Sequence, residues 1–162
     1  MTLSEQLQLD AGGAMTSILE QRSQIGVDVL DGLEKKFGIS FSDEYKSFLI
    51  NTNGGKPSPK RFVTLDKKVE SMVVRFFSAG TNEEESLEVE YEEYVASGAI
   101  PSDFIPIAYD PAGNRVLLCV GGEGRESIYY WSVDEEPEEF SCSRKYMRKI
   151  SNGFNEFFDG LF

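Results

Sequence analysis

The segment 103–133 constrains the fold of this 162-residue chain more than any other part of its sequence. It contains two turn sequences: D-P-A-G at 110–113, which has Asp, Pro and Gly at the positions that favour a type I turn, and a glycine cluster at 121–124. Around these turns lie segments rich in β-branched and aromatic residues, which suit a pleated sheet: 104–109, 114–120 and 127–133. Short strands joined by short turns pair with their neighbours, so the segment predicts a three-stranded antiparallel meander.

Apolar residues recur at helical spacing in three segments that precede the meander. The first is 27–37, followed by Gly38 as a C-terminal stop. The second runs from an N-cap at Ser42 to the N-G-G sequence at 53–55. The third is expected to begin after an N-cap at Asn82, with acidic residues in its first turn, and to end at Gly98.

A helix is also expected at the end of the chain, over 152–161, with Ser151 or Asn152 as its N-cap. One stripe of this helix is apolar and must cover the sheet: Phe154, Phe157, Phe158 and Leu161. Two further strands are predicted at 61–65 and 71–77. The order of elements predicts an α+β fold, with a single, mainly antiparallel β-sheet and helices packed against it.

The composition is that of one globular domain, which we place at 25–162. Residues 1–24 are expected to form an N-terminal tail, with a short helix over 14–21 as an alternative. The sequence has no apolar run that could span a membrane, and its N-terminus does not resemble a secretory signal. Cys119 and Cys142 either pair or stay as free thiols; we favour free thiols and a cytoplasmic location.

The net charge of −12 is concentrated in two segments. Residues 83–93 include seven acidic residues, residues 134–139 include five, and neither segment has a basic residue. Nucleic acids and anionic membranes bind basic surfaces, so we expect neither as a partner, whereas a basic protein would be attracted. In the alternative interpretation, both segments are solvated faces that keep the protein soluble.

The sequence contains no histidine, which removes the commonest general base and a frequent metal ligand. The carboxylates at 134–139 do not have the spacing of a calcium-binding loop. The glycines at 121–124 are not followed by a helix, as a nucleotide-binding loop requires. We therefore expect no enzymatic activity, no metal and no cofactor.

Several signatures then follow one another in a recognisable order: D-E-Y-K-S-F-L at 43–49, N-G-G at 53–55, I-P at 100–101, F-I-P-I-A-Y-D-P-A-G-N at 104–114, I-Y-Y-W at 128–131 and F-N-E-F-F at 154–158. Over about residues 27–162 the chain resembles the SUKH superfamily, which contains a fungal cell-wall-assembly regulator and many bacterial immunity proteins. It departs from the family pattern after Trp131, where Ser132 and Val133 precede the acidic residue Asp134.

The resemblance implies a SUKH-like α+β fold and a non-enzymatic binding role. In bacteria the usual role in this superfamily is to bind and neutralise a toxin domain of a polymorphic or contact-dependent toxin system. Many such toxins are nucleases with basic active surfaces, so the expected partner is a basic toxin domain. The alternative is a regulatory or scaffold module of the same fold that binds a cellular protein or a small ligand. The oligomeric state is left open.

The candidate partner-binding residues lie beside the first turn, on the last strand of the meander and in the two acidic segments: Tyr109, Asp110, Asn114, Tyr129, Trp131, Asp134, Glu135, Glu136, Glu84 and Glu88. Aromatic residues would anchor the partner, and the charges would attract it. In the alternative, Asp110 and Asn114 only close the turn, and Trp131 belongs to the core. Alternation along the strand predicts that one of Tyr130 and Trp131 faces inward and the other outward.

Overall fold

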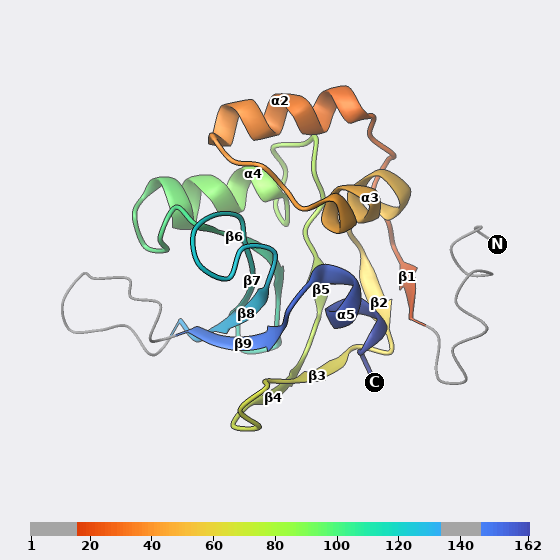
Figure 1. Cartoon of the computed structure of the whole chain (residues 1–162). Coiled ribbons are helices and arrows are strands. Elements are labelled where there is room, and N and C mark those ends of the chain that lie inside the picture. The colour runs from red at the N-terminus through yellow and green to blue at the C-terminus, as the bar shows by residue number, and fades with distance from the viewer. Residues whose placement is uncertain (1–15, 134–146) are drawn as a thin grey trace.

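The computed structural model describes residues 16–133 and 147–162 and has an α+β architecture (Figure 1). The centre of the described part is a five-stranded antiparallel sheet, in which each strand pairs with the next one in sequence. Its strands are β5 (Arg75–Phe76), β6 (Phe104–Tyr109), β7 (Arg115–Cys119), β8 (Ile128–Trp131) and β9 (Met147–Ser151). The predicted meander is confirmed as β6-β7-β8, and β9 extends it by a strand that the sequence pattern did not predict.

The first meander turn has the predicted chemistry. The backbone N–H of Gly113 donates to the carbonyl oxygen of Asp110 at 3.0 Å, and Gly113 has a φ of 84°, which glycine adopts without strain. Strands β6 and β7 on either side of this turn pair from Tyr109↔Arg115 to Phe104↔Cys119, with an irregularity between Pro106 and Ala108. The turn therefore sets the register of the central pair of strands.

Two helices begin and end as their sequences predict. Helix α2 (Val27–Phe37) ends at Gly38, which has a left-handed conformation. Helix α3 (Asp43–Thr52) begins after Ser42, whose side-chain oxygen accepts a hydrogen bond from the backbone N–H of Tyr45 at 3.3 Å. Both helices bury one apolar stripe in the large hydrophobic core.

The third helix begins later than expected. Helix α4 (Leu87–Glu90) has Ser86 as its N-cap, not Asn82, and continues into a π-helical turn, η1 (Tyr91–Ala96). Glu85 has a φ of 64°, outside the helical range, so residues 83–85 lie in a loop before the helix. The prediction that they occupy its first turn was wrong, because the true cap is the serine four residues further on.

Helix α5 (Phe154–Asp159) is shorter than the predicted 152–161. Ser151 pairs with Ile128 as part of β9, and Gly153 occupies the N-cap position without a side-chain hydrogen bond, so neither predicted cap residue serves as one. The apolar stripe is confirmed, since all its members are buried: Phe154, Phe157, Phe158 and Leu161. The three phenylalanine rings of the stripe pack on the rings of Phe48 and Phe76.

Residues outside the main sheet form two short antiparallel pairs, so the expectation of a single sheet is corrected. One pair joins β1 (Ser17–Leu19) to β2 (Lys56–Ser58), and the other joins β3 (Arg61–Val63) to β4 (Glu70–Met72). The helix suggested for 14–21 is therefore wrong over its described part. The strand predicted at 71–77 is divided between two sheets, because β4 pairs with β3 while β5 pairs with β6.

The main sheet is buried on both faces, which the sequence interpretation did not anticipate. Tyr130 belongs to a large core with α2, α3 and α5, whereas Trp131 belongs to a smaller core on the other face with Ile100, Phe104 and Met147. Alternation along β8 is therefore correct, but neither residue points into solvent. None of the helices in the described ranges is long and apolar enough to cross a membrane.

Candidate functional site

Asp110 and Asn114 form a buried hydrogen-bond network under the first meander turn. Asp110 is only 3% exposed; its Oδ2 accepts from the hydroxyls of Ser71 and Tyr130 at 2.9 and 2.8 Å. Its Oδ1 accepts from the backbone N–H of Asn114 at 2.8 Å, and Asn114 in turn accepts from the N–H of Val133. Burial raises the pKa of Asp110, but these hydrogen bonds outweigh it and hold the pKa below its usual value. Both side chains are buried, and their hydrogen bonds close the turn, as in the alternative interpretation of these residues.

The aromatic candidates are buried or half-buried and contact other residues of the fold. Trp131 is 5% exposed and packs edge-on against Tyr94, with ring centroids 5.7 Å apart. Tyr129 is half-buried and packs edge-on against Phe104. Tyr109 is half-buried and donates a hydrogen bond from its hydroxyl to Glu85 at 2.7 Å. Of the three aromatic candidates, Trp131 is buried, whereas Tyr109 and Tyr129 each keep part of the side chain exposed.

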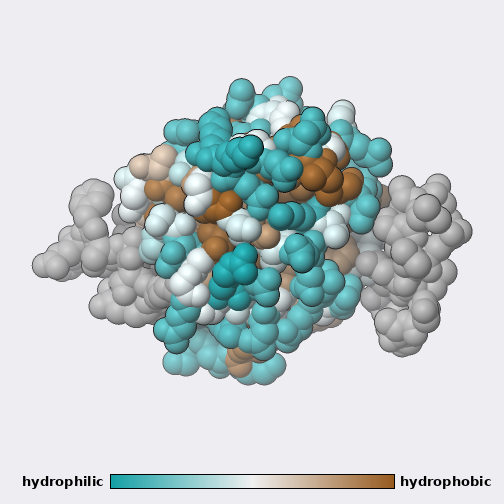
Figure 2. All heavy atoms as spheres, turned by 45° about the horizontal axis from the view of Figure 1, so that its top comes forward, coloured by the Kyte–Doolittle hydropathy of each residue, from teal (hydrophilic) through white to brown (hydrophobic). Residues whose placement is uncertain are grey.

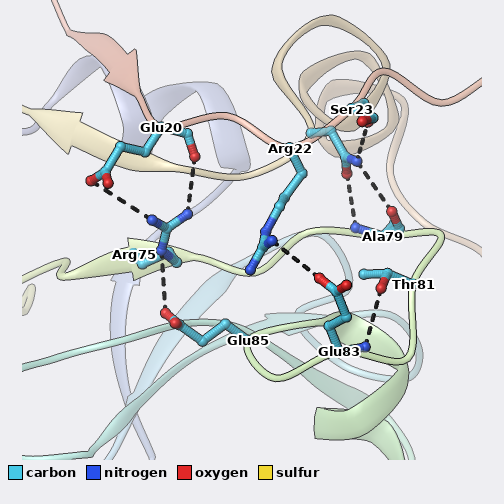
Figure 3. A network of polar contacts seen from close by, with 9 residues as sticks. Glu20, Arg22, Ser23, Arg75, Ala79, Thr81, Glu83 and Glu85 are labelled. Carbon is cyan, nitrogen blue, oxygen red and sulfur yellow. Dashed lines mark hydrogen bonds and ion pairs between the residues drawn. The ribbon is translucent and has the colours of Figure 1, made fainter.

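Glu83 and Glu85 of the acidic segment 83–93 form ion pairs with arginines that hold the N-terminal segment in place (Figure 3). Arg75 is largely buried; its Nε lies 3.2 Å from Glu85, and its Nη1 donates to the backbone oxygen of Glu20 at 3.0 Å. Arg22 pairs with Glu83 at 3.1 Å in an exposed position. These carboxylates tie residues 20–22 to the loop before α4, and so they contribute to the fold.

Glu90 is committed to a buried ion pair. Its Oε1 lies 2.7 Å from Nε of Arg115 on β7, and both side chains are almost fully buried. Arg115 also donates to the hydroxyl of Tyr94 at 3.1 Å and lies over the Tyr94 ring. Burial raises the pKa of Glu90, and the Arg115 guanidinium opposes that shift. This pair fastens α4 and η1 to the sheet.

The remaining carboxylates of the segment mark a different surface. Glu84, Glu92 and Glu93 are exposed and have no ion pair within the described ranges. A shallow cleft of about 350 Å³ lies beside two of them, between the C-terminal end of α2 and α4–η1; its lining residues are Lys36, Asn82, Glu88, Val89, Glu92 and Glu93. We call it the α2/α4 cleft. Figure 2 shows that the face turned forward there is mostly hydrophilic, with smaller hydrophobic patches between.

Glu88 is the buried member of this cleft. It is 7% exposed, and its Oε1 has no hydrogen-bond donor among the described residues. Burial raises the pKa of Glu88, although hydrogen bonds from the backbone of Thr81 and Gly80 and the charge of Lys36 oppose the shift. The cleft therefore combines exposed carboxylates at its rim with a desolvated carboxyl beneath them.

Sequence reasoning and structure agree on this cleft only in part. Glu88 was among the predicted residues and Glu92 and Glu93 lay in the predicted acidic segment, but Lys36, Asn82 and Val89 carried no functional signal. Glu84 is exposed but does not line the cleft. The predicted residues Asp134, Glu135 and Glu136, like Cys142, lie outside the described residues.

The carboxylates of the cleft can accept hydrogen bonds from a cation or a basic protein surface, while Lys36 and Asn82 in the same lining can donate them. Within the described ranges, no three His, Cys, Asp or Glu side chains are placed to hold a metal ion together. Cys119 is buried, and its Sγ donates to the carbonyl oxygen of Gly121 at 3.1 Å. The α2/α4 cleft is therefore suited to recognise the charge and shape of a binding partner.

Comparison with known proteins identifies the family. A comparison with the curated proteins finds no match. The model of the SMI1/KNR4 family (SUKH-1) matches residues 26–160, which is most of the chain and includes α2 to α5 and the whole five-stranded sheet. On this evidence, together with the α+β fold, the chain belongs to the SMI1/KNR4 family (SUKH-1).

Proposed function

We propose that this protein is an immunity protein that binds and neutralises a toxin domain of a polymorphic or contact-dependent bacterial toxin system. The observation that carries the proposal is family membership, since the SMI1/KNR4 family includes immunity proteins and cell-wall regulators. The family is known for protein–protein interactions and is generally non-enzymatic. In this proposal the protein acts in the cytoplasm by covering its partner, without catalysis of its own.

The charge of the protein supports a basic partner. The net charge is −12, and exposed carboxylates remain at Glu84, Glu92 and Glu93 after the internal ion pairs of the segment are formed. A nuclease toxin must present basic residues to the phosphates of its substrate, so an acidic protein is suited to occupy that surface. Complementary charge of this kind raises the rate of association and discourages wrong partners.

The test is to express the toxin domain encoded next to this protein's gene in a sensitive bacterial host. We expect growth arrest with the toxin domain alone and normal growth when this protein is present. The purified pair should form a complex of defined stoichiometry, and the complex should lack the toxin's activity. A toxin domain that stays active and unbound in the presence of excess protein would rule the proposal out for that pair.

The alternative is a regulatory or scaffold module that binds a cellular protein or a small ligand. It is favoured by the cell-wall regulators in the same family. The two functions differ in what deletion of the gene does to the cell. Loss of an immunity protein is lethal only while the neighbouring toxin gene is intact, whereas loss of a regulator has the same effect with or without that gene.

A further inference from the structure

The α2/α4 cleft has an arrangement of charge that the fold does not require. The other carboxylates near it have internal partners: Glu83 pairs with Arg22, Glu85 with Arg75 and Glu90 with Arg115. Glu92 and Glu93 have no ion pair within the described ranges, and the lining holds these two carboxylates and Glu88 against the single positive charge of Lys36. The cleft therefore keeps negative charge that is available to an incoming group.

Glu88 is an independent indication that this cleft receives a ligand. A buried carboxylate oxygen without a hydrogen-bond donor destabilises a protein, because its lost hydration is not replaced. Glu88 is 93% buried, given its 7% exposure, yet its Oε1 lacks a donor while it lines a cleft that opens between two helices. A structural carboxylate such as Asp110, by contrast, has hydrogen-bond donors on both oxygens. The oxygen without a donor therefore distinguishes Glu88 from the structural carboxylate Asp110.

We propose that the α2/α4 cleft receives a basic side chain of the protein partner, with Glu88 as the buried acceptor and Glu92 and Glu93 as the acceptors at the rim. The inference rests on the proposed function, since it assigns one contact within that interface. Arginine fits better than lysine, because its planar guanidinium carries five N–H donors in a fixed arrangement and loses less hydration on burial. Val89, which is half-buried in the lining, offers an apolar surface to the aliphatic part of such a side chain.

The test uses a probe that does not depend on identifying the partner. The full-length ¹⁵N-labelled protein is titrated with the tripeptide acetyl-Gly-Arg-Gly-amide, and amide chemical shifts are followed by NMR. The matched control is the same peptide with citrulline, which has nearly the shape of arginine but no charge. With the arginine peptide we expect saturable chemical-shift changes centred on the amides of Gly80, Thr81 and Val89. The affinity for the citrulline peptide should be at least about tenfold lower, as loss of a charge-assisted hydrogen bond implies.

Variants of the protein then assign the contact. Glu88→Gln should weaken binding of the arginine peptide about tenfold, whereas Glu84→Gln, an exposed position outside the cleft, should change it less than twofold. The exposed double variant Glu92→Gln/Glu93→Gln should weaken binding several-fold, and it decides the matter if Glu88→Gln does not fold. Unchanged affinity in the Glu88→Gln protein, or shifts located away from the cleft, would overturn the inference.

Failure of this inference and failure of the proposed function have different signatures. If the neighbouring toxin domain is neutralised but the arginine peptide does not bind at the cleft, the immunity function stands and the assigned contact is wrong. If the peptide binds at the cleft but the toxin domain remains active, the cleft recognises basic side chains in the service of another partner.

Discussion

At the scale of single residues, four carboxylates of the segment 83–93 illustrate three different surroundings. Glu90 is buried and paired with Arg115, Glu92 and Glu93 are exposed, and Glu88 is buried with an oxygen that lacks a donor. Pairing lets a buried charge stabilise the fold, and exposure leaves it free to act on a partner. Glu88 has neither advantage, so its cost to stability should be measurable.

We predict that Glu88→Gln makes the protein more stable at pH 7, by about 1 kcal/mol, because a neutral amide is less costly to bury than an unpaired carboxylate. The pKa of Glu88 is raised, chiefly by burial, so the contribution of Glu88 to the stability of the wild type is most favourable below the ordinary value of 4.5 and becomes less favourable as the pH rises through the folded-state pKa. The gain should therefore appear above pH 4.5 and vanish below it. Urea denaturation across this range measures it, with Glu84→Gln as the control; a variant less stable than the wild type at pH 7 contradicts the prediction.

Residue-level reasoning from the sequence predicted local contacts and missed those made between residues that are distant in the chain. The pattern D-x-x-x-N predicted the closed turn at 110–114, because its hydrogen bonds are local. The burial of Trp131 depends on Ile100 and Tyr94, which are distant in sequence and cover the second face of the sheet. The α2/α4 cleft likewise brings Lys36 next to Glu92, and no local pattern predicts such a contact.

At the scale of elements, strong local signals gave correct predictions and weak ones did not. The meander, α2 and α3 have turn or cap residues whose effect is local, and their positions were predicted. Strand β1 is three residues long and forms only through pairing with β2. Its sequence is too short to show the alternation of apolar and polar residues from which a strand is predicted. The helix expected from Asn82 begins after Ser86, because two nearby residues could act as cap and tertiary contacts decided between them.

Helix α5 should contribute more to stability than its six residues suggest. Phe157 is 3% exposed and contacts the rings of Phe62 and Phe76 edge-on. Phe157→Ala should reduce the free energy of unfolding by about 3–5 kcal/mol, because it leaves a cavity in the aromatic core. Phe162→Ala, at a half-exposed ring, should cost about 1 kcal/mol or less. Chemical denaturation compares the two, and a cost below about 1 kcal/mol for Phe157→Ala would show that the core tolerates the loss.

The attachment of the N-terminal segment should depend on one arginine much more than on the other. Arg75 is largely buried and bonds both the backbone and the carboxylate side of Glu20, whereas the Arg22–Glu83 pair is exposed. Arg75→Gln should therefore cost about 1.5–3 kcal/mol and Arg22→Gln less than about 1 kcal/mol. Hydrogen exchange at Ile18 and Leu19 gives a local readout, and exchange should accelerate in the first variant only. Equal acceleration in both would mean that β1 is held mainly by its pairing with β2.

At the scale of the whole molecule, the net charge of −12 does not say where on the surface the unpaired negative charge lies. Carboxylates such as Glu85 and Glu90 form ion pairs with arginines of the same chain. The exposed carboxylates of the segment 83–93 include those beside the α2/α4 cleft. Whether Asp134, Glu135 and Glu136 add to this surface stays a prediction from the sequence. Attraction of a partner should then depend on where a charge is removed, not only on how much charge is removed.

The matching experiment compares two variants that change the net charge equally. Glu92→Lys alters the cleft, whereas Glu70→Lys alters the β3-β4 hairpin, which lies at the opposite end of the molecule from α4 (Figure 1). With the toxin domain as partner, Glu92→Lys should slow association several-fold at low ionic strength and less than twofold at high ionic strength, because salt screens the attraction between exposed charges. Glu70→Lys should change the association rate less than twofold at both. Equal slowing by the two variants would mean that the partner responds to the total charge of the protein, and the cleft would then have no special part in bringing the two together.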